Sequence, residues 1–285
     1  MTFTSKDHNY MASAIKLAAK GLCTTSPNPR VGCVLVKDDQ IVGEGFHVKA
    51  GQGHAEVNAI KQAGELAKGA TAYVTLEPCS HYGRTPPCAE GLIKAGVVKV
   101  IAAMVDPNPA VSGRGLAMLA TAGIETGAGL LEADAITLNP GFIKLMEHGL
   151  PYVRCKLAAS MDGKTAMASG ESKWVTGDKA RSDVQMIRAR SCAVIAGADS
   201  ILTDNAKMNV RFEQLNQPDF SEDNLRQPLR VVIDSKNRLS PDLAFFNIES
   251  NIVVIRKSFD EKHDWPAHVE QLVLPTVTCY SEKNS

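Results

Sequence analysis

The sequence predicts two α/β domains, a first domain with a mixed sheet and a second domain in which strands and helices alternate. The chain has 285 residues, a length that favours two domains over one. The first half has a hairpin-like pair of apolar segments followed by alternating helical and strand-like segments, and the second half starts a new alternation. Between the halves, His148-Gly149-Leu150-Pro151 interrupts the pattern, so we place the boundary between residues 148 and 149.

The composition is that of a neutral protein. Lys and Arg together number 31, as do Asp and Glu, so the net charge provides no general attraction to nucleic acid or to an anionic membrane. No apolar run is long enough to span a bilayer, and the polar opening Met1–His8 contains an acidic residue, unlike a signal peptide. We therefore expect a cytoplasmic protein that binds neither membranes nor nucleic acid.

The cysteines point to the same compartment. They number seven, an odd count in a chain without a recognisable secretion signal, so disulfides are not expected. Five of them are expected to be small and mostly buried apolar residues: Cys23, Cys33, Cys155, Cys192 and Cys279.

In the first half, the spacing of apolar residues predicts the elements in turn. A helical stripe over 7–20 ends at Gly21, and strands over 31–36 and 41–46 form a hairpin. A helix runs from His54 towards Gly69, and further strands are predicted over 72–76 and 97–104. The remaining helices are predicted to start at Cys88 and to cover 115–122 and 130–146, the last with a kink at Asn139-Pro140-Gly141.

One imidazole, two thiols and one carboxylate in this half form the pattern of a catalytic zinc site. His54 and Glu56 lie in the first turn of one predicted helix, Cys79 follows a strand, and Cys88 opens the next helix. Three protein ligands leave the fourth position of zinc for a water, whose pKa the metal lowers towards neutrality. Glu56 need not be a ligand, and we expect it to carry protons as a general acid and base. The helix dipoles are expected to favour a carboxylate at Glu56 and a thiolate at Cys88.

Two other interpretations of the same residues are less favoured. Cys79 and Cys88 could be ordinary thiols beside a solvated histidine, but the order and placement of all four residues argue against coincidence. A structural zinc usually takes four protein ligands, and no further Cys or His lies at a natural spacing. His81 is the nearest candidate, and we place it at the rim of the pocket.

The segment Pro27-Asn28-Pro29 is a candidate for substrate recognition. Two prolines fix the backbone around an amide that can both donate and accept, which suits the edge of a pyrimidine, although a rigid turn explains the segment almost as well. His47, at the end of the hairpin, is a second candidate contact.

The second half is predicted to be a doubly wound or related α/β domain. Strands are predicted over 152–158, 193–197, 230–233 and 252–256, with a turn at 160–164 and a helix over 181–190. The polar segment Leu215–Gln227 is predicted to be a surface loop. In such domains ligands bind at the carboxyl ends of the strands, and the residues alone indicate only an anionic ligand.

The motifs of the first half resemble a known family. His54-Ala55-Glu56, Thr75-Leu76-Glu77-Pro78-Cys79-Ser80-His81 and Gly83-Arg84-Thr85-Pro86-Pro87-Cys88 are similar to the bifunctional deaminase/reductase of riboflavin biosynthesis. The wider cytidine-deaminase superfamily commonly spaces the two cysteines only three apart, so the longer insert is a more particular mark. The resemblance implies a cytidine-deaminase-like fold and a substrate that is a diaminopyrimidinone with a ribosylamino 5′-phosphate. It also favours Asn28 as a substrate contact.

The second half resembles the reductase part of the same family, in the runs 156–163, 169–176 and 231–235. The resemblance implies a dihydrofolate-reductase-like fold that uses NADPH to reduce the ribosyl group to a ribityl chain. Carried over by position, the NADPH contacts are Ala158, Trp174, Ser200, Asp204 and Ser235, and the substrate contacts are Ser172, Arg188, Met208 and Arg211. Guanidinium groups suit a phosphate because they bind it through two parallel hydrogen bonds, whereas Arg188 could otherwise be a solvated helix charge.

The second half also departs from the family pattern in two places. Ala206 stands where the family usually has proline, a change expected to leave Asp204 in place. The family pattern continues with a Glu- and Gly-rich nucleotide-binding segment and closing strands, whereas this sequence ends with Thr278–Ser285. This difference predicts that deamination is retained and reduction is impaired, unless the sequence is a fragment of a longer one.

Three functions are compatible with these features of the sequence. The first is the bifunctional deaminase/reductase, with Zn²⁺ and NADPH as cofactors and a pyrimidine ribonucleotide as substrate; we also expect a homo-oligomer. The second is a nucleic-acid or nucleoside deaminase with a non-catalytic second domain, which predicts a basic, aromatic-lined face. The third is a non-catalytic, zinc-stabilised binding protein, in which Glu56 is dispensable.

Overall fold

The computed structural model describes residues 2–82, 86–109, 111–215 and 221–274. Gly83-Arg84-Thr85 of the cysteine motif, part of the predicted loop Leu215–Gln227, and the end Thr278–Ser285 with Cys279 lie outside the described residues. Backbone contacts divide the chain between Leu157 and Ala158 into two compact units.

The first unit is built on a mixed sheet with the strand order β2-β1-β3-β4-β5. Strands β1 (Gly32–Lys37) and β2 (Gln40–Phe46) form the predicted hairpin, and β1 also pairs antiparallel with β3 (Thr71–Val74). Asp38 and Asp39 at the turn both have positive φ angles, as a two-residue turn that follows the twist of the strands requires. Parallel strands β4 (Lys99–Ala102) and β5 (Glu125–Ala128) complete the sheet.

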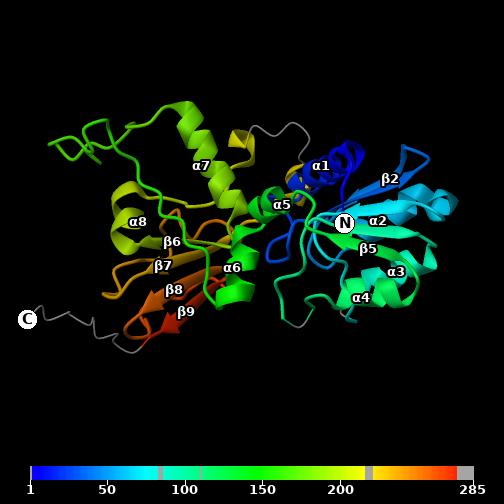
Figure 1. Ribbon diagram of the computed structural model, residues 1–285. Coiled ribbons are helices and arrows are strands. Elements are labelled where there is room, and N and C mark those ends of the chain that lie inside the picture. Colours follow the sequence, from blue (N-terminus) through cyan, green and yellow to red (C-terminus); the bar gives the residue numbers. More distant parts are fainter. Residues whose placement is uncertain (1, 83–85, 110, 216–220, 275–285) are drawn as a thin grey trace, which may run out of the picture. The chain divides into compact units, whose positions relative to one another are not determined.

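Helices cover both faces of this sheet (Figure 1). Helices α2 (Ala55–Ala63), α3 (Cys88–Lys94) and α4 (Arg114–Thr121) pack in a core that includes Ala72 and Val74 of β3. Helices α1 (Ser5–Ala19), α5 (Glu132–Leu138) and α6 (Pro140–His148) share a core with Tyr73 of the same strand. The two cores lie on opposite faces because neighbouring side chains of a strand point in opposite directions. A short 3₁₀ helix, η1 (Gly64–Ala67), continues α2.

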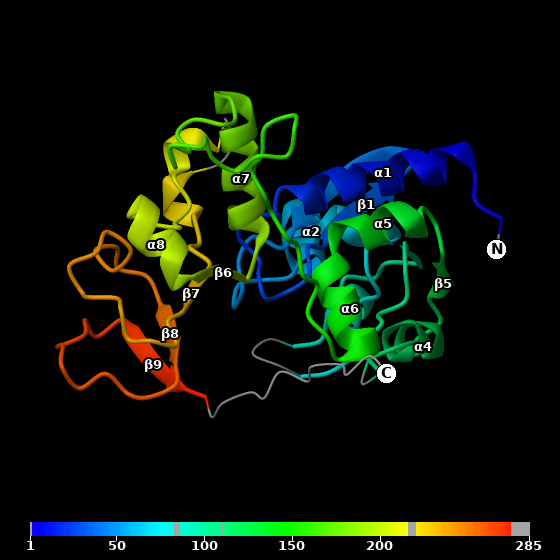
Figure 2. The same ribbon diagram turned by 90° about the vertical axis from the view of Figure 1, so that its left-hand side faces the viewer.

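The predicted kinked helix over 130–146 is two helices, α5 and α6, which meet at Asn139 (Figure 2). Pro140 is the first residue of α6, where its missing N–H costs no helical hydrogen bond. Strand β5 was not predicted, because its sequence Glu-Thr-Gly-Ala has little apolar or β-branched character.

Small residues bring α2 unusually close to β2. A Cβ atom at Gly43 would lie 2.4 Å from the carbonyl oxygen of Ala59, and one at Gly45 would lie 2.3 Å from that of Ala55. The facing positions Ala55, Ala59 and Ala63 are buried alanines. The backbones of strand and helix therefore touch directly, which fixes the position of the helix that carries His54 and Glu56 at its start.

The second unit contains a sheet of four parallel strands in sequence order, β6 (Ala193–Gly197), β7 (Leu229–Ile233), β8 (Ile252–Arg256) and β9 (Val269–Val273). Helix α7 (Asp178–Arg190) precedes β6, and α8 (Ala198–Asp204) follows it. Short 3₁₀ helices η2 (Phe212–Gln214) and η3 (Glu222–Asn224) lie before β7. The predicted alternation holds only as far as β7, because residues 234–251 connect β7 to β8 through turns.

Three expectations for the second half are corrected by the structure. The predicted strand Tyr152–Ala158 is irregular, and within the described residues its backbone joins neither sheet. Its alternating pattern therefore buries nothing: Val153 is 76% exposed and Leu157 79% exposed. Cys155 and Cys192 are exposed rather than buried, whereas Cys23 and Cys33 are buried as expected. All cysteines that the structure describes are free.

Within the described part of the chain, the helices are too short or too polar to cross a lipid bilayer.

The contact between β2 and α2 gives a prediction for stability. Gly45→Ala is expected to destabilise the first unit by about 1 to 3 kcal/mol, because the new methyl group forces strand and helix apart. Urea unfolding measures this change. Gly91→Ala in α3 is the matched control, since its Cβ would meet only Ile60 Cδ1 at 3.9 Å. Equal stability of both variants would contradict the argument.

Candidate active site

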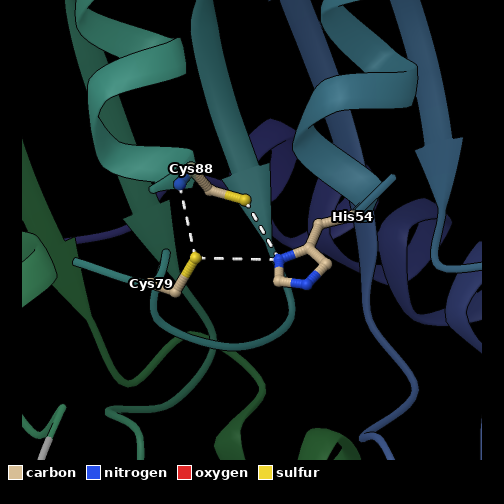
Figure 3. Close-up of side chains that lie close together, drawn as sticks. All are labelled: His54, Cys79 and Cys88. Carbon is tan, nitrogen blue, oxygen red and sulfur yellow. Dashed lines mark hydrogen bonds between the residues drawn. The ribbon is translucent and has the colours of Figure 1, made fainter. Parts of the chain in front are cut away.

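The side chains of His54, Cys79 and Cys88 converge on one point of the first unit (Figure 3). His54 is the N-cap residue of α2, Cys88 is the first residue of α3, and Cys79 lies in the loop that follows β3. His54 Nδ1 lies 3.2 Å from Cys88 Sγ and 3.7 Å from Cys79 Sγ. Two helix starts and a strand-end loop therefore present three metal-binding atoms to one another.

The donor set fits a zinc ion. Nitrogen and sulfur ligands of a tetrahedral zinc are separated by about 3.5 Å, and both observed separations lie close to this value. All three ligand atoms lie within 4.8 Å of one another, and among the described residues no other His, Cys, Asp or Glu belongs to this group. His81 is exposed and outside the group, which leaves the position of a fourth ligand to a water or a substrate.

Glu56 lies beside these ligands and is only 3% exposed. Burial raises the pKa of the Glu56 carboxyl, and the neighbouring Cys79 thiolate raises it further, against the lowering effect of a backbone hydrogen bond. The expected stabilisation of the carboxylate by the helix start is therefore outweighed by burial. A carboxylate whose pKa is raised accepts a proton more readily than an ordinary carboxylate does.

The two thiols divide the negative charge unequally. Hydrogen bonds from Cys88 and from His54 lower the pKa of the Cys79 thiol to about 4, although burial opposes this effect. The same hydrogen bond and burial raise the pKa of the Cys88 thiol. Without a metal ion, the thiolate is thus favoured at Cys79. A thiolate at Cys88, which the helix start and a bound metal together would favour, stays a prediction.

Asn28 and His47 lie next to the ligand set. Asn28 Nδ2 is 3.2 Å from His47 Nε2, and His47 Nδ1 is 3.2 Å from the carbonyl oxygen of Gly53. A neutral His47 that donates from Nδ1 and accepts at Nε2 satisfies both contacts. The His47 ring also meets the His54 ring edge to face, with centroids 5.3 Å apart. Burial lowers the pKa of His47, which favours this neutral form.

Asn139 holds the Asn28 loop in place, a role that the sequence did not reveal. Its side-chain oxygen accepts from Arg30 N at 2.8 Å, and its side-chain nitrogen donates to Arg30 O at 2.9 Å. Asn139 is buried at the junction of α5 and α6. The break between these helices therefore presents a side chain that fixes the backbone two residues beyond Asn28.

In the second unit, the predicted substrate contacts Arg188, Met208 and Arg211 lie together. Arg188 Nη1 donates to the carbonyl oxygen of Asn209 at 2.9 Å, and Arg188 Nη2 lies 3.7 Å from Met208 Sδ. Burial, and then the charge of Arg211, lower the pKa of Arg188. Two half-buried guanidinium groups therefore lie near each other, which is unfavourable without an anion.

Gln185, one turn before Arg188 on α7, orders this cluster. It is buried, its Oε1 accepts from Arg211 N at 3.1 Å, and its Nε2 donates to Gln214 Oε1 at 3.3 Å. Gln214 Oε1 also accepts from Arg211 Nη1 at 3.3 Å. Gln185 could not be predicted as a functional residue, because the sequence does not show that its face of the helix is buried.

The predicted NADPH contacts fall into two groups. Ser200 and Asp204 lie on α8, which follows β6, and Ser235 follows β7. These three residues therefore lie at the carboxyl edge of the parallel sheet. An ion pair of 2.7 Å between Arg238 and Asp199 joins this loop to α8.

Ala158, Ser172 and Trp174 lie in the irregular segment before α7. No hydrogen bond or ion pair among the described residues joins them to Arg188, α8 or Ser235. Trp174 is 70% exposed, and the Arg181 guanidinium lies 4.4 Å from its ring centroid.

The first unit thus has the architecture and the ligand set of a zinc-dependent deaminase, joined to a second α/β unit. Residues 4–104 match the family model described as the cytidine and deoxycytidylate deaminase zinc-binding region, and residues 151–280 match the RibD C-terminal domain. The chain belongs to the RibD family of bifunctional deaminase/reductases of riboflavin biosynthesis. This family uses Zn²⁺ and NADPH, and the match favours it over a nucleic-acid deaminase.

The relatives cover nearly the whole chain. Riboflavin biosynthesis protein RibD of Haemophilus influenzae is 54% identical over 96% of this chain and 75% of its own length, and that of Escherichia coli is 52% identical over 95% and 74%. A structure of Acinetobacter baumannii RibD is 50% identical with a TM-score of 0.87, covering 95% of this chain and 75% of that one.

A second solved structure belongs to a protein that is named for both activities. It is a diaminohydroxyphosphoribosylaminopyrimidine deaminase/5-amino-6-(5-phosphoribosylamino)uracil reductase from Thermotoga maritima, 39% identical, with a TM-score of 0.84 over 94% of this chain and 74% of that one. The predicted cytidine-deaminase-like and dihydrofolate-reductase-like classes are thereby confirmed.

The contact between Asn139 and Arg30 gives a second prediction. Asn139→Ala is expected to destabilise the first unit by about 2 kcal/mol or more, because it removes two hydrogen bonds to the buried backbone of Arg30. Thermal unfolding measures the loss. Asn9→Ala, at an exposed position of α1, is the matched control and should melt as the wild type does. A wild-type melting temperature for Asn139→Ala would refute the role.

Proposed function

We infer that His54, Cys79 and Cys88 hold the zinc ion of this deaminase and that Glu56 carries its protons. The observation that carries this assignment is the convergence of three ligand atoms within 4.8 Å beside a buried carboxylate. Zinc, when bound, supplies a Lewis acid that lowers the pKa of a water to near neutrality. Glu56 would accept the proton of this water and deliver protons to the pyrimidine ring nitrogen and to the departing amine.

The substrate of this step is 2,5-diamino-6-ribosylamino-4(3H)-pyrimidinone 5′-phosphate. Asn28 and His47 are proposed to orient the pyrimidine, because His47 packs against His54 and Asn28 contacts His47. The Asn28 amide can donate and accept along the edge of the ring, and the neutral His47 keeps it in one orientation. Asn139 would preserve this arrangement through the backbone of Arg30.

The second step, reduction of the ribosyl group, is assigned to the second half. We assign residues 1–148 to deamination and residues 149–285 to reduction. Arg188 and Arg211 would bind the 5′-phosphate, with Met208 and Ser172 as neighbouring substrate contacts. Ala158, Trp174, Ser200, Asp204 and Ser235 would hold NADPH, which supplies the hydride. Support comes from the two guanidinium groups, which have no carboxylate partner among the described residues.

Three broader expectations complete the proposal. The protein acts in the cytoplasm, where its cysteines stay reduced. It acts on a free ribonucleotide rather than on nucleic acid, in line with its family. It functions as a homo-oligomer, which analytical ultracentrifugation tests directly.

Glu56→Gln tests the proton carrier. The amide cannot accept the proton of the water, so we expect deamination to fall by about 100-fold or more. Mass spectrometry of the products with and without NADPH measures both steps, and metal analysis checks that zinc is retained. Glu44→Gln, on an exposed position of β2, is the matched control. Full deamination by a zinc-loaded Glu56→Gln protein would show that Glu56 is not the proton carrier, whereas no deamination by the zinc-loaded wild type would favour the non-catalytic zinc-binding alternative.

Arg188→Gln tests phosphate binding in the second half. The loss of one charged hydrogen-bonding partner, about 1.5 to 3 kcal/mol, predicts a KM for the deaminated nucleotide that is roughly 10- to 100-fold higher. Steady-state reduction kinetics with the phosphorylated and the dephosphorylated substrate measure the effect. The matched control is Lys179→Gln, an exposed cation at the start of the same helix. If KM rises equally for both substrates, Arg188 does not bind the phosphate.

A further inference from the structure

Glu77, two residues before Cys79, is a buried carboxylate that receives four main-chain hydrogen bonds. Its Oε1 accepts from Gly115 N at 2.8 Å and from Leu116 N at 3.2 Å. Its Oε2 accepts from Gly113 N at 2.9 Å and from Asp106 N at 3.1 Å. The side chain is 3% exposed, and among the described residues no Lys, Arg or His forms an ion pair with it.

These bonds replace the usual cap of α4. Gly113 is the N-cap residue of this helix, adopts a φ angle of 75°, and has no side chain to cap it. The N–H groups of Gly115 and Leu116 are the second and third of the helix, which an N-cap side chain normally satisfies. Glu77 provides this cap from a different segment of the chain, and the start of the helix stabilises its negative charge.

A second contact joins the same helix to the residue between Glu77 and Cys79. A Cβ atom at Gly115 would lie 1.9 Å from the carbonyl oxygen of Pro78. Helix α4 therefore touches the Pro78 backbone directly, and only glycine permits this approach. The chain is thus held at two successive residues before it reaches Cys79.

Cys79 is held on its other side by α3. Its carbonyl oxygen accepts from Ala89 N at 3.2 Å, and its Sγ accepts from Cys88 N at 3.3 Å. The thiol is therefore fixed between the starts of two helices. The contact with α3 uses atoms of Cys79 itself, whereas the contact with α4 depends on the side chain of Glu77.

We propose that Glu77 is a positioning residue for the metal site: by fixing the Pro78-Cys79 backbone against α4, it places Cys79 Sγ opposite His54 and sets the affinity for zinc. The inference rests on the proposed role of Cys79 as a ligand. Residues that orient metal ligands typically change metal affinity by about 10- to 100-fold when they are replaced. A side chain that merely fills the core would have no such effect.

The test is the zinc affinity of Glu77→Gln, measured by competition with a chromogenic chelator. The amide keeps the shape of the side chain but presents an NH₂ group to two of the four N–H donors. We expect a dissociation constant for Zn²⁺ that is at least 10-fold higher. The absorption spectrum of the Co²⁺-substituted protein should also change, since it reports the geometry of the thiolate ligands.

Gly115→Ala perturbs the same loop from the side of α4 and leaves the Glu77 carboxylate unchanged. Its Cβ displaces the Pro78 carbonyl, so the same loss of zinc affinity is expected. Gly91→Ala is its matched control, and Met11→Ala controls for lost stability, because it removes a fully buried side chain from the other face of the sheet. Both controls should bind zinc as the wild type does.

The outcomes distinguish a failure of the positioning role of Glu77 from a failure of the assignment of Cys79 as a ligand. If Glu77→Gln and Gly115→Ala keep wild-type zinc affinity and Co²⁺ spectrum and only melt earlier, as Met11→Ala does, then Glu77 is purely structural. If neither variant folds, Glu77→Asp, which keeps the charge on a shorter side chain, carries the same expectation for zinc and the same condition for rejection. If Cys79→Ser itself keeps full zinc affinity, the ligand assignment fails, whatever Glu77 does.

Discussion

The starts of three helices, α2, α3 and α4, meet around the loop that follows β3, and the deaminase site depends on this arrangement. Helix α2 contributes His54 and Glu56, α3 contributes Cys88, and α4 anchors the loop through Glu77. The helices can approach so closely because glycine replaces side chains at two contacts, Gly45 against α2 and Gly115 against Pro78. The ligand atoms are therefore positioned mainly by backbone contacts, which tolerate little variation in side-chain volume.

The hairpin and the start of α3 at Cys88 could be predicted because they depend on local patterns, and both appear in the structure. The convergence of His54, Cys79 and Cys88 could be predicted although up to 34 residues separate them, because their side-chain types mark them as possible metal ligands. The roles of Glu77 and Asn139 could not be predicted, because their partners are main-chain groups up to 39 and 109 residues away. The segment 152–158 has a strand-like pattern, but a strand also needs a neighbouring edge to pair with, which alternation alone does not reveal.

Charge explains why the first unit needs a cation. The carboxyls of Glu56 and Glu77 are buried, and the half-buried Cys79 favours a thiolate. Helix starts and the N–H groups around Glu77 stabilise part of this negative charge. They do not neutralise it, so buried anions remain that a divalent ion would balance. Burial, and then the charge of Cys79, raise the pKa of Glu56, as suits a carboxyl that carries protons.

The candidate site of the second unit has an excess of positive charge. Arg188 and Arg211 are held near each other by neutral groups, the Asn209 carbonyl, the Met208 sulfur and the amide of Gln214. Such partners orient the guanidinium groups without neutralising them, and each charge lowers the stability of the other. An anion with several oxygen atoms, such as a phosphate, would satisfy both groups at once. In the proposed function, a nucleotide 5′-phosphate would complete the second site electrostatically, as zinc would complete the first.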